Sequence, residues 1–232
     1  MALLSGDGVL FLLRWIHFLA GITWIGILYY FNFVQVPYVG ETQPAERGAL
    51  VPKLLPRALW WFRWGAMVTF LSGWLYLGLR AHQGGFFAGS YGWAILLGGL
   101  IGSFMWFNVW FVIWPNQKIV IENAIGTAAG RPANPAAAPA GARAGLASRT
   151  NTALSVPMLF MMGSASHLTM GVPKSGAVFW VVALAILLAI EINALKGTPG
   201  QGVSKPLATV SGTLWAGFIL AAVYYLWFEI MR

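Results

Sequence analysis

Long apolar runs alternate with short polar segments along the whole chain. Six of these runs are long enough to cross a hydrocarbon core of about 30 Å at about 1.5 Å per helical residue. Because backbone amides in lipid must find partners within their own segment, helices are the expected conformation. The pattern therefore predicts an all-α integral membrane protein, a six-transmembrane-helix bundle. The expected helices cover residues 9–31, 58–79, 91–114, 152–172, 176–195 and 207–228.

Composition supports lipid as the solvent of this chain. Apolar residues make up 59% of the 232 positions and charged residues only 9%, which excludes an ordinary water-soluble domain. The first run has no small-residue cleavage site after it, so we expect it to stay in the protein and not to act as a signal peptide. The whole of 1–232 is expected to form a single transmembrane domain.

Basic residues favour one orientation of the six helices. Short loops rich in Lys and Arg stay in the cytoplasm, and the loops at 32–57, 115–151 and 196–206 hold most of the 14 basic residues. This predicts that both termini face the outer, periplasmic side. The net charge of +8 is divided among loops around an apolar body, so no nucleic-acid partner is expected.

One stretch has low complexity. Residues 126–148 are rich in Ala, Pro and Gly, a composition typical of a flexible connector, here expected on the cytoplasmic side between two groups of three helices. Cysteine is absent, which excludes disulfides, iron-sulfur clusters and thiolate-held haem within this chain.

Polar residues at membrane depth are the first candidates for chemistry, because inserting them is costly. His17 near the start of the first span and His167 near the end of the fourth are expected at the same face and nearly the same depth. Gly21 and Gly163 lie one turn deeper on the same helix faces. This arrangement suits a b-type haem with two axial histidines, and glycines would leave room for the macrocycle.

Other interpretations of these residues stay open. A membrane histidine often only bonds across a helix interface, and glycine is common wherever helices pack closely. His82 lies at a helix–loop junction on the outer side, as a third haem contact or simply a solvated residue. Near the cytoplasmic ends of their spans, Arg63 and Glu191 are expected to reach the interface with their long side chains.

Several blocks of sequence resemble a known family. The first is Arg14-Trp15-Ile16-His17 with the following Phe18 to Gly26 and Tyr29 to Phe33. The second runs from Asn108 through Trp114-Pro115-Asn116-Gln117 to Lys118, and the third from Ala147 through Pro157 to His167. In this order they resemble the membrane domain of the bacterial cytochrome-c-coupled urate hydroxylases, the urate oxidase N-terminal family.

The resemblance implies oxidation of urate to 5-hydroxyisourate in the bacterial inner membrane, with electrons passed to a c-type cytochrome. The family's cytochrome domain has no counterpart here, so the acceptor is expected to be a separate, external polypeptide. Urate is an anionic purine and favours a cationic or amide-lined pocket with aromatic walls. The candidate substrate-binding residues are Arg63, Asn108, Asn116, Gln117 and Arg149.

Three classes of function follow from the sequence. The first is a membrane redox protein with haem b, in its leading version urate hydroxylase-like. The second is a small-solute transporter built of two three-helix halves. The third is a cofactor-free accessory subunit of a respiratory complex. No nucleotide loop, zinc motif or serine nucleophile pattern is present to favour another class.

Overall fold

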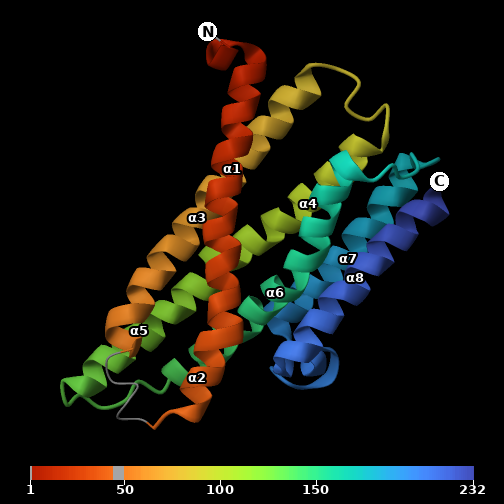
Figure 1. Ribbon diagram of the computed structural model, residues 1–232. Coiled ribbons are helices and arrows are strands. Elements are labelled where there is room, and N and C mark those ends of the chain that lie inside the picture. Colours follow the sequence, from red (N-terminus) through yellow and green to blue (C-terminus); the bar gives the residue numbers. More distant parts are fainter. Residues whose placement is uncertain (1, 44–49) are drawn as a thin grey trace.

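The computed structural model describes residues 2–43 and 50–232, and this part of the chain is helical, with connecting turns and no strand. Part of the basic loop expected at 32–57 lies outside the described residues. The described helices form six rods, which run alternately in opposite directions along one bundle (Figure 1). The described starts of α1 and the end of α8 lie toward the same end of the bundle, as an even number of rods requires.

Three of the rods contain a π-helical segment and the other three are α-helices alone. The first is α1 (Gly6–Tyr29), η2 (Tyr30–Gln35) and α2 (Val36–Glu41); the second is η4 (Leu50–Leu54) and α3 (Leu55–His82); the third is α4 (Ser90–Phe107), η5 (Asn108–Ile113) and α5 (Trp114–Ala128). The remaining rods are α6 (Ala137–His167), α7 (Gly176–Lys196) and α8 (Val210–Met231).

Four of the rods are long and apolar enough to cross a membrane: Gly6–Glu41, Ser90–Ala128, Gly176–Lys196 and Val210–Met231. The rods built on α3 and α6 fall outside this group. The reason for α6 is visible in its burial, since the polar side chains of Asn151, Thr152 and Ser155 are fully enclosed by other helices. A helix surrounded by protein needs less apolar surface than one that faces lipid.

Several helix ends in the structure differ from the expected ones, among them the end of the fourth span and the start of the sixth. The fourth span was expected to continue to Val172, but α6 ends at His167 and Leu168 is extended, before a segment with Gly171 and Pro173 that disfavours helix. The sixth was expected from residue 207. Instead, a 3-10 helix with an internal proline, η6 (Gly202–Ala208), precedes α8, whose first turn is capped by the hydroxyl of Thr209.

The connector expected at 126–148 is much shorter in the structure. Helix α5 continues to Ala128 and α6 begins at Ala137, so only the eight intervening residues form a turn. Alanine has the highest helix propensity, and Pro139 lies in the first turn of α6, where its missing N–H costs no hydrogen bond. Burial of Ala140 and Ala144 then fixes this part of the helix against its neighbours.

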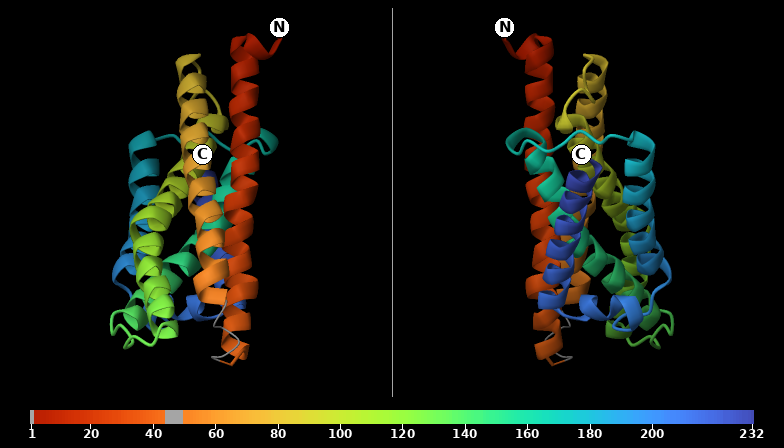
Figure 2. Two further views of the ribbon diagram at one scale, coloured as in Figure 1. Left: turned by 90° about the vertical axis from the view of Figure 1, so that its left-hand side faces the viewer. Right: turned by 90° about the vertical axis from the view of Figure 1, so that its right-hand side faces the viewer.

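The first and third rods are longer than a bilayer is thick. They have 36 and 39 residues, or about 54–58 Å at about 1.5 Å per residue, against a hydrocarbon core of about 30 Å. The excess lies at the end of the bundle that carries α2, α5 and η6 (Figure 1). At the opposite end, α1 and α3 project together beyond the other helices (Figure 2).

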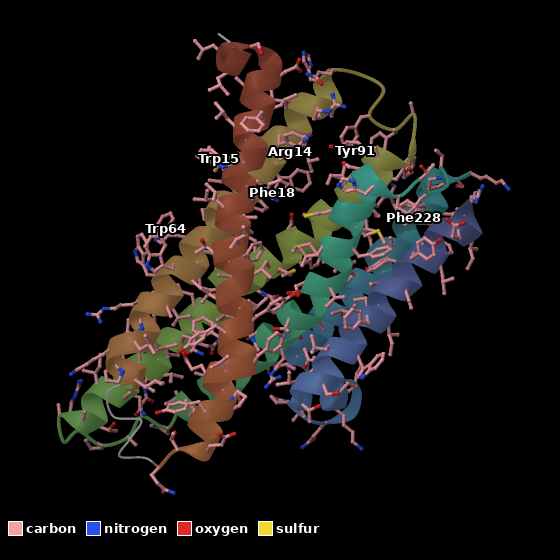
Figure 3. All side chains as sticks on the ribbon, viewed as in Figure 1. Arg14, Trp15, Phe18, Trp64, Tyr91 and Phe228 are labelled. Carbon is pink, nitrogen blue, oxygen red and sulfur yellow. The ribbon has the colours of Figure 1, made fainter. Side chains whose placement is uncertain are left out.

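The helices of the bundle pack closely against one another. Helix α1 packs mainly on α3, where a Cβ at Gly65 would lie only 3.2–3.3 Å from the backbone of Trp24 and Ala20. Helix α6 packs on α4 and α8 in the middle of the molecule. Tryptophans such as Trp15 and Trp64 point outward from α1 and α3 (Figure 3), as expected of residues that face lipid or its interface.

Candidate functional site

A cavity of about 330 Å³ lies at the end of the bundle that carries α2, α5 and η6. Its volume is at the lower end of the roughly 300–1,000 Å³ that is typical of small-molecule sites. Its walls are formed by η2, α2, α3, η5, α5, α6 and η6, together with the loop residues Pro199 and Gly200. The residues that matter for recognition are Phe31, Asn32, Gln35, Gln117, Ser148 and Arg149.

Three polar atoms of the cavity residues are buried without a hydrogen-bond partner among the described residues. They are the side-chain oxygens of Gln35 and Gln117 and the Nη1 atom of Arg149. An unpaired buried polar group costs about 1–3 kcal/mol, so three of them around one cavity indicate a place for a polar ligand or water. Together they offer two acceptors and one charged donor, with Phe31 as an aromatic wall.

Two π-helical segments contribute to the cavity. η2 carries Phe31, Asn32 and Gln35, and η5 ends at Ile113, which also lines the wall. A π-helical turn contains one extra residue, so it shifts the side chains that follow relative to those before it, and such segments are frequent at functional sites. η2 lies at the end of the first apolar run, expected at 9–31, and η5 lies inside the third, expected at 91–114.

Further hydrogen bonds fix the rim of the cavity. The amide of Asn32 donates to Ser148 Oγ at 2.8 Å and to Leu28 O at 2.9 Å, and so joins the first rod to α6. Arg143 donates to the carbonyls of Ala194 and Gly197 at 3.2 and 3.1 Å. These bonds fix the end of α7 next to Pro199 and Gly200, which line the cavity.

Among the described residues of the cavity wall, Arg149 is the only charged one. Partial burial lowers the pKa of its guanidinium from the ordinary value, but a guanidinium stays protonated at any physiological pH. The cavity therefore presents a permanent positive charge, and among the described residues no ion pair neutralises it.

Of the five predicted substrate-binding residues, the structure places Gln117 and Arg149 in the cavity and leaves the other three outside its lining. The Arg63 guanidinium lies 3.8 Å from the ring centroid of Trp114, a cation–π contact. Its expected position at the membrane interface stays a prediction. The Asn116 amide donates to Val112 O at 2.7 Å within its own rod.

Asn108 belongs to a separate buried network. Its Nδ2 atom donates to Asn151 Oδ1 and to Glu191 Oε2, both at 3.0 Å. The expectation that Glu191 reaches the membrane interface is wrong, since its side chain is 5% exposed and bonded inside the bundle. The sequence offered no signal for this beyond the cost of a carboxyl in an apolar run.

His17 faces helix α3. Its Nδ1 atom lies 2.9 Å from the carbonyl oxygen of Thr69, and a Cβ at Gly73 would lie 2.9–3.0 Å from the ring. Gly21, one turn further, also faces Thr69. An imidazole that donates Nδ1–H to a carbonyl leaves Nε2 with a lone pair, the arrangement usual for metal-binding histidines.

The other proposed haem residues are at the protein surface. His167 is the last residue of α6 and is exposed, Gly163 has open space around it, and His82 is exposed at the end of α3. The start of α1 and the end of α6 lie toward the same end of the bundle (Figure 1), as expected from the odd and even spans. The structure describes no hydrogen bond or ring contact of His167 with His17, so the haem pair stays a prediction.

A cluster that the sequence did not indicate lies near His17. Arg14 donates to the hydroxyl of Tyr76, which is 3.4 Å from the hydroxyl of Tyr91. Figure 3 shows Arg14 on the side of α1 that faces Tyr91. The cluster joins α1, α3 and α4 at the end opposite the cavity.

Comparison with known families identifies the chain. The profile described as "Urate oxidase N-terminal" matches residues 84–224, well over half of the 232 residues. The chain belongs to the urate oxidase N-terminal family. No curated protein and no solved structure matches it.

The part matched by the urate oxidase N-terminal family contains two of the three sequence blocks that carry the resemblance. It includes Gln117, Arg149 and Glu191, but the first rod, with His17 and the cavity residues Asn32 and Gln35, lies before it. The family match therefore covers the part of the chain that forms the α4-to-α8 side of the cavity.

Proposed function

We propose that this protein takes part in urate oxidation in the bacterial inner membrane and binds urate in the cavity around Arg149. The observation that carries the proposal is the cavity itself, with a buried, unpaired guanidinium nitrogen beside two unpaired amide oxygens. Membership of the urate oxidase N-terminal family supports the choice of ligand.

The chemistry of the cavity is complementary to urate. Urate is a flat anion that carries carbonyl oxygens and ring N–H groups. Arg149 supplies a charged donor to a carbonyl or to the anionic edge, and charge-assisted bonds of this kind are the strong ones. The oxygens of Gln35 and Gln117 accept from N–H groups, and Phe31 supplies a surface for the ring.

The reaction that we propose hydroxylates urate with water. Urate and water give 5-hydroxyisourate, two protons and two electrons. The electrons pass to a c-type cytochrome, a separate polypeptide in this proposal. In this scheme the cavity residues bind and orient urate and hold it away from bulk water.

A b-type haem on His17 and His167 is a further part of the proposal. If His17 Nδ1 donates to the backbone carbonyl of Thr69, its Nε2 atom would be free to hold a haem iron. A haem would supply one-electron transfer. Gln35 lies 18 residues after His17 on the same rod, about 27 Å at about 1.5 Å per residue, so we derive no direct step between urate and a haem at this place.

Urate binding to the purified protein in detergent tests the cavity. Arg149→Gln removes the charged donor and is expected to weaken binding at least tenfold, since a charge-assisted hydrogen bond contributes about 1.5–3 kcal/mol. Arg57→Gln is the matched control, an exposed arginine on α3 outside the cavity lining, and should bind as wild type. Equal binding by wild type and Arg149→Gln would overturn the cavity assignment.

Turnover separates the proposed enzyme from the other function classes. Urate-dependent reduction of an added c-type cytochrome is expected, with loss in Arg149→Gln. Uptake of labelled urate into proteoliposomes without its conversion would identify a transporter instead. A cofactor-free accessory subunit would show none of the three: no urate binding, no conversion and no uptake.

The absorption spectrum tests the haem separately. A Soret band and a reduced α-band are expected in the purified protein, with both bands lost in His17→Ala and in His167→Ala. His82→Ala is expected to keep them if that residue is only solvated. A colourless, fully folded protein would remove haem b from the proposal but leave the cavity untouched.

A further inference from the structure

A carboxyl group is enclosed in the middle of the bundle without a cation. The side chain of Glu191 is 5% exposed, and the two amides next to it, Asn108 and Asn151, are fully buried. An isolated charge in such a place is very costly unless it is paired. The network of Asn108, Asn151 and Glu191 joins η5, α6 and α7. Its hydrogen bonds define the orientation of the two side-chain amides.

The orientation of the amides follows from one backbone carbonyl. Asn151 Nδ2 donates to Met105 O at 2.9 Å, which turns Asn151 Oδ1 toward Asn108. Asn108 must therefore present its Nδ2 atom to that oxygen, and the same nitrogen donates to Glu191 Oε2. Both N–H bonds of Asn108 are used, and a reversed amide would place oxygen against two oxygens.

Two acceptor atoms are then left over in the same place. Asn108 Oδ1 and Glu191 Oε1 are both buried, and neither has a hydrogen-bond partner among the described residues. They belong to the two groups that already share the bond from Nδ2 to Oε2. An ionised carboxylate leaves both oxygens unsatisfied, because neither group has a further proton to donate.

One added proton would give both unpaired oxygens a hydrogen-bond partner. We propose that Glu191 and Asn108 form a proton-binding site, in which Glu191 is a neutral carboxylic acid and donates Oε1–H to Asn108 Oδ1. The amide and the acid then share two parallel hydrogen bonds along one edge, N–H to Oε2 and O–H to Oδ1. The charge disappears from the bundle core together with the two unpaired acceptors.

Among the described residues, the helices packed against α7 place no charged group in hydrogen-bond or ion-pair contact with Glu191. The titratable and charged groups on the helices packed against α7 include Tyr91 on α4; Arg143, Arg149 and His167 on α6; and Tyr224, Tyr225 and Glu229 on α8. Arg143 bonds to carbonyls at the end of α7, and Tyr224 donates to Ala183 O. Neither makes a described contact with Glu191.

The proton site lies close to the cavity along two helices. Asn108 is the first residue of η5, whose last residue, Ile113, lines the cavity, and Asn151 follows the cavity residue Arg149 by two positions on α6. The site therefore places one exchangeable proton about one helical turn deeper in the bundle than the cavity wall. This inference does not depend on urate as the ligand of the cavity.

Infrared spectroscopy of the whole protein in detergent or lipid tests the site. At neutral pH we expect a carbonyl band of a protonated carboxyl group, lost in Glu191→Gln and unchanged in Glu122→Gln, an exposed glutamate on α5. Absence of this band from the wild-type protein would overturn the proposal, whatever the variants do.

Thermal stability supplies the second measurement. Glutamine has the shape of the neutral acid and can also donate to Asn108 Oδ1, so Glu191→Gln is expected to melt within about 2 °C of wild type. Glu191→Leu leaves Asn108 Nδ2 and Oδ1 without their partner on residue 191 and is expected to melt about 5 °C lower or more. If the site instead holds a monovalent cation, sodium in place of choline would raise the melting temperature of wild type but not of Glu191→Gln. That outcome would also overturn the proton site.

Discussion

Gln117 presents a buried, unpaired acceptor oxygen at the cavity, so its replacements separate a lost hydrogen bond from an added charge. Gln117→Leu removes one bond and should weaken urate binding about two- to tenfold, from a net contribution of about 0.5–1.5 kcal/mol. Gln117→Glu adds a carboxylate that repels the anion and pairs with Arg149, so it should weaken binding more than Gln117→Leu does.

The matched control for Gln117→Glu is Thr127→Glu, which places the same charge on an exposed position of α5 outside the cavity lining. Its dissociation constant, measured by titration calorimetry, should equal that of wild type. An equal loss in both charge variants would indicate a general electrostatic effect and not a contact in the cavity.

The ring of His17 makes a second position sensitive to a single methyl group. In Gly73→Ala the new Cβ would lie 2.9–3.0 Å from the imidazole, so α1 and α3 must separate or the ring must turn, at a cost of about 1–3 kcal/mol. Gly78→Ala, on the same helix with open space around it, should stabilise the protein by about 0.5–1 kcal/mol. Melting temperatures of the two variants should therefore move in opposite directions.

Sequence reasoning reached only part of the cavity. Gln117 and Arg149 were found because the family resemblance pointed to cationic and amide residues near the ends of spans. Asn32 and Gln35 were missed because the first apolar run ends at Phe31, and polar residues after such a run normally mark a loop. In the structure the helix continues through η2 and turns these polar residues inward.

At the scale of helices, the contact of α8 with α6 depends on a missing side chain. A Cβ at Gly217 would lie 2.7 Å from Val156 Cγ2 and 2.8 Å from the carbonyl oxygen of Ala153. A backbone carbonyl cannot rotate away, so Gly217→Ala should lower the free energy of unfolding by about 1–3 kcal/mol. Gly98→Ala on α4 mainly meets Met162, whose flexible side chain adapts, and should cost less.

Denaturant titration of wild type, Gly217→Ala and Gly98→Ala measures the free energy of unfolding of each. Gly163→Ala is the control, since its new Cβ meets no atom within 4 Å. We expect Gly217→Ala to be less stable than Gly98→Ala. Equal stabilities of Gly217→Ala and Gly163→Ala would show that α8 is not held against α6 at this distance.

Hydropathy located the six rods well but not their ends. The apolar runs reproduce the membrane-length part of each helix, because burial in lipid or protein is what those residues share. Hydropathy missed the extension of the first rod through η2 and α2, the extension of the third rod through α5, and the start of α6 at Ala137, since these segments are held by packing against each other. Helices that owe their stability to tertiary contacts leave no long apolar run in the sequence.

At the scale of the whole molecule, the number of crossings decides which side the cavity faces. The sequence predicts six spans, whereas four rods meet the length and composition of a membrane helix. The two possibilities differ in where the connections lie. If α3 and α6 cross, as the alternating directions of the rods favour, Leu4 and the 84–89 turn share the outer side and the 129–136 turn lies inside. If α3 and α6 did not cross, the 84–89 turn would be opposite Leu4 and the 129–136 turn would be with it, against the arrangement of the rods in the structure.

The absence of cysteine makes this topology directly measurable. Single cysteines at Leu4, Ala88 and Ala136, all exposed positions in the structure, can be labelled in intact cells with a membrane-impermeant maleimide. We expect Leu4→Cys and Ala88→Cys to react in intact cells and Ala136→Cys to react only after lysis, as the basic loops require for six spans with the cavity on the cytoplasmic side. Reaction of Leu4→Cys and Ala136→Cys without Ala88→Cys would establish four spans, and urate would then reach the cavity by a different side from the one expected here.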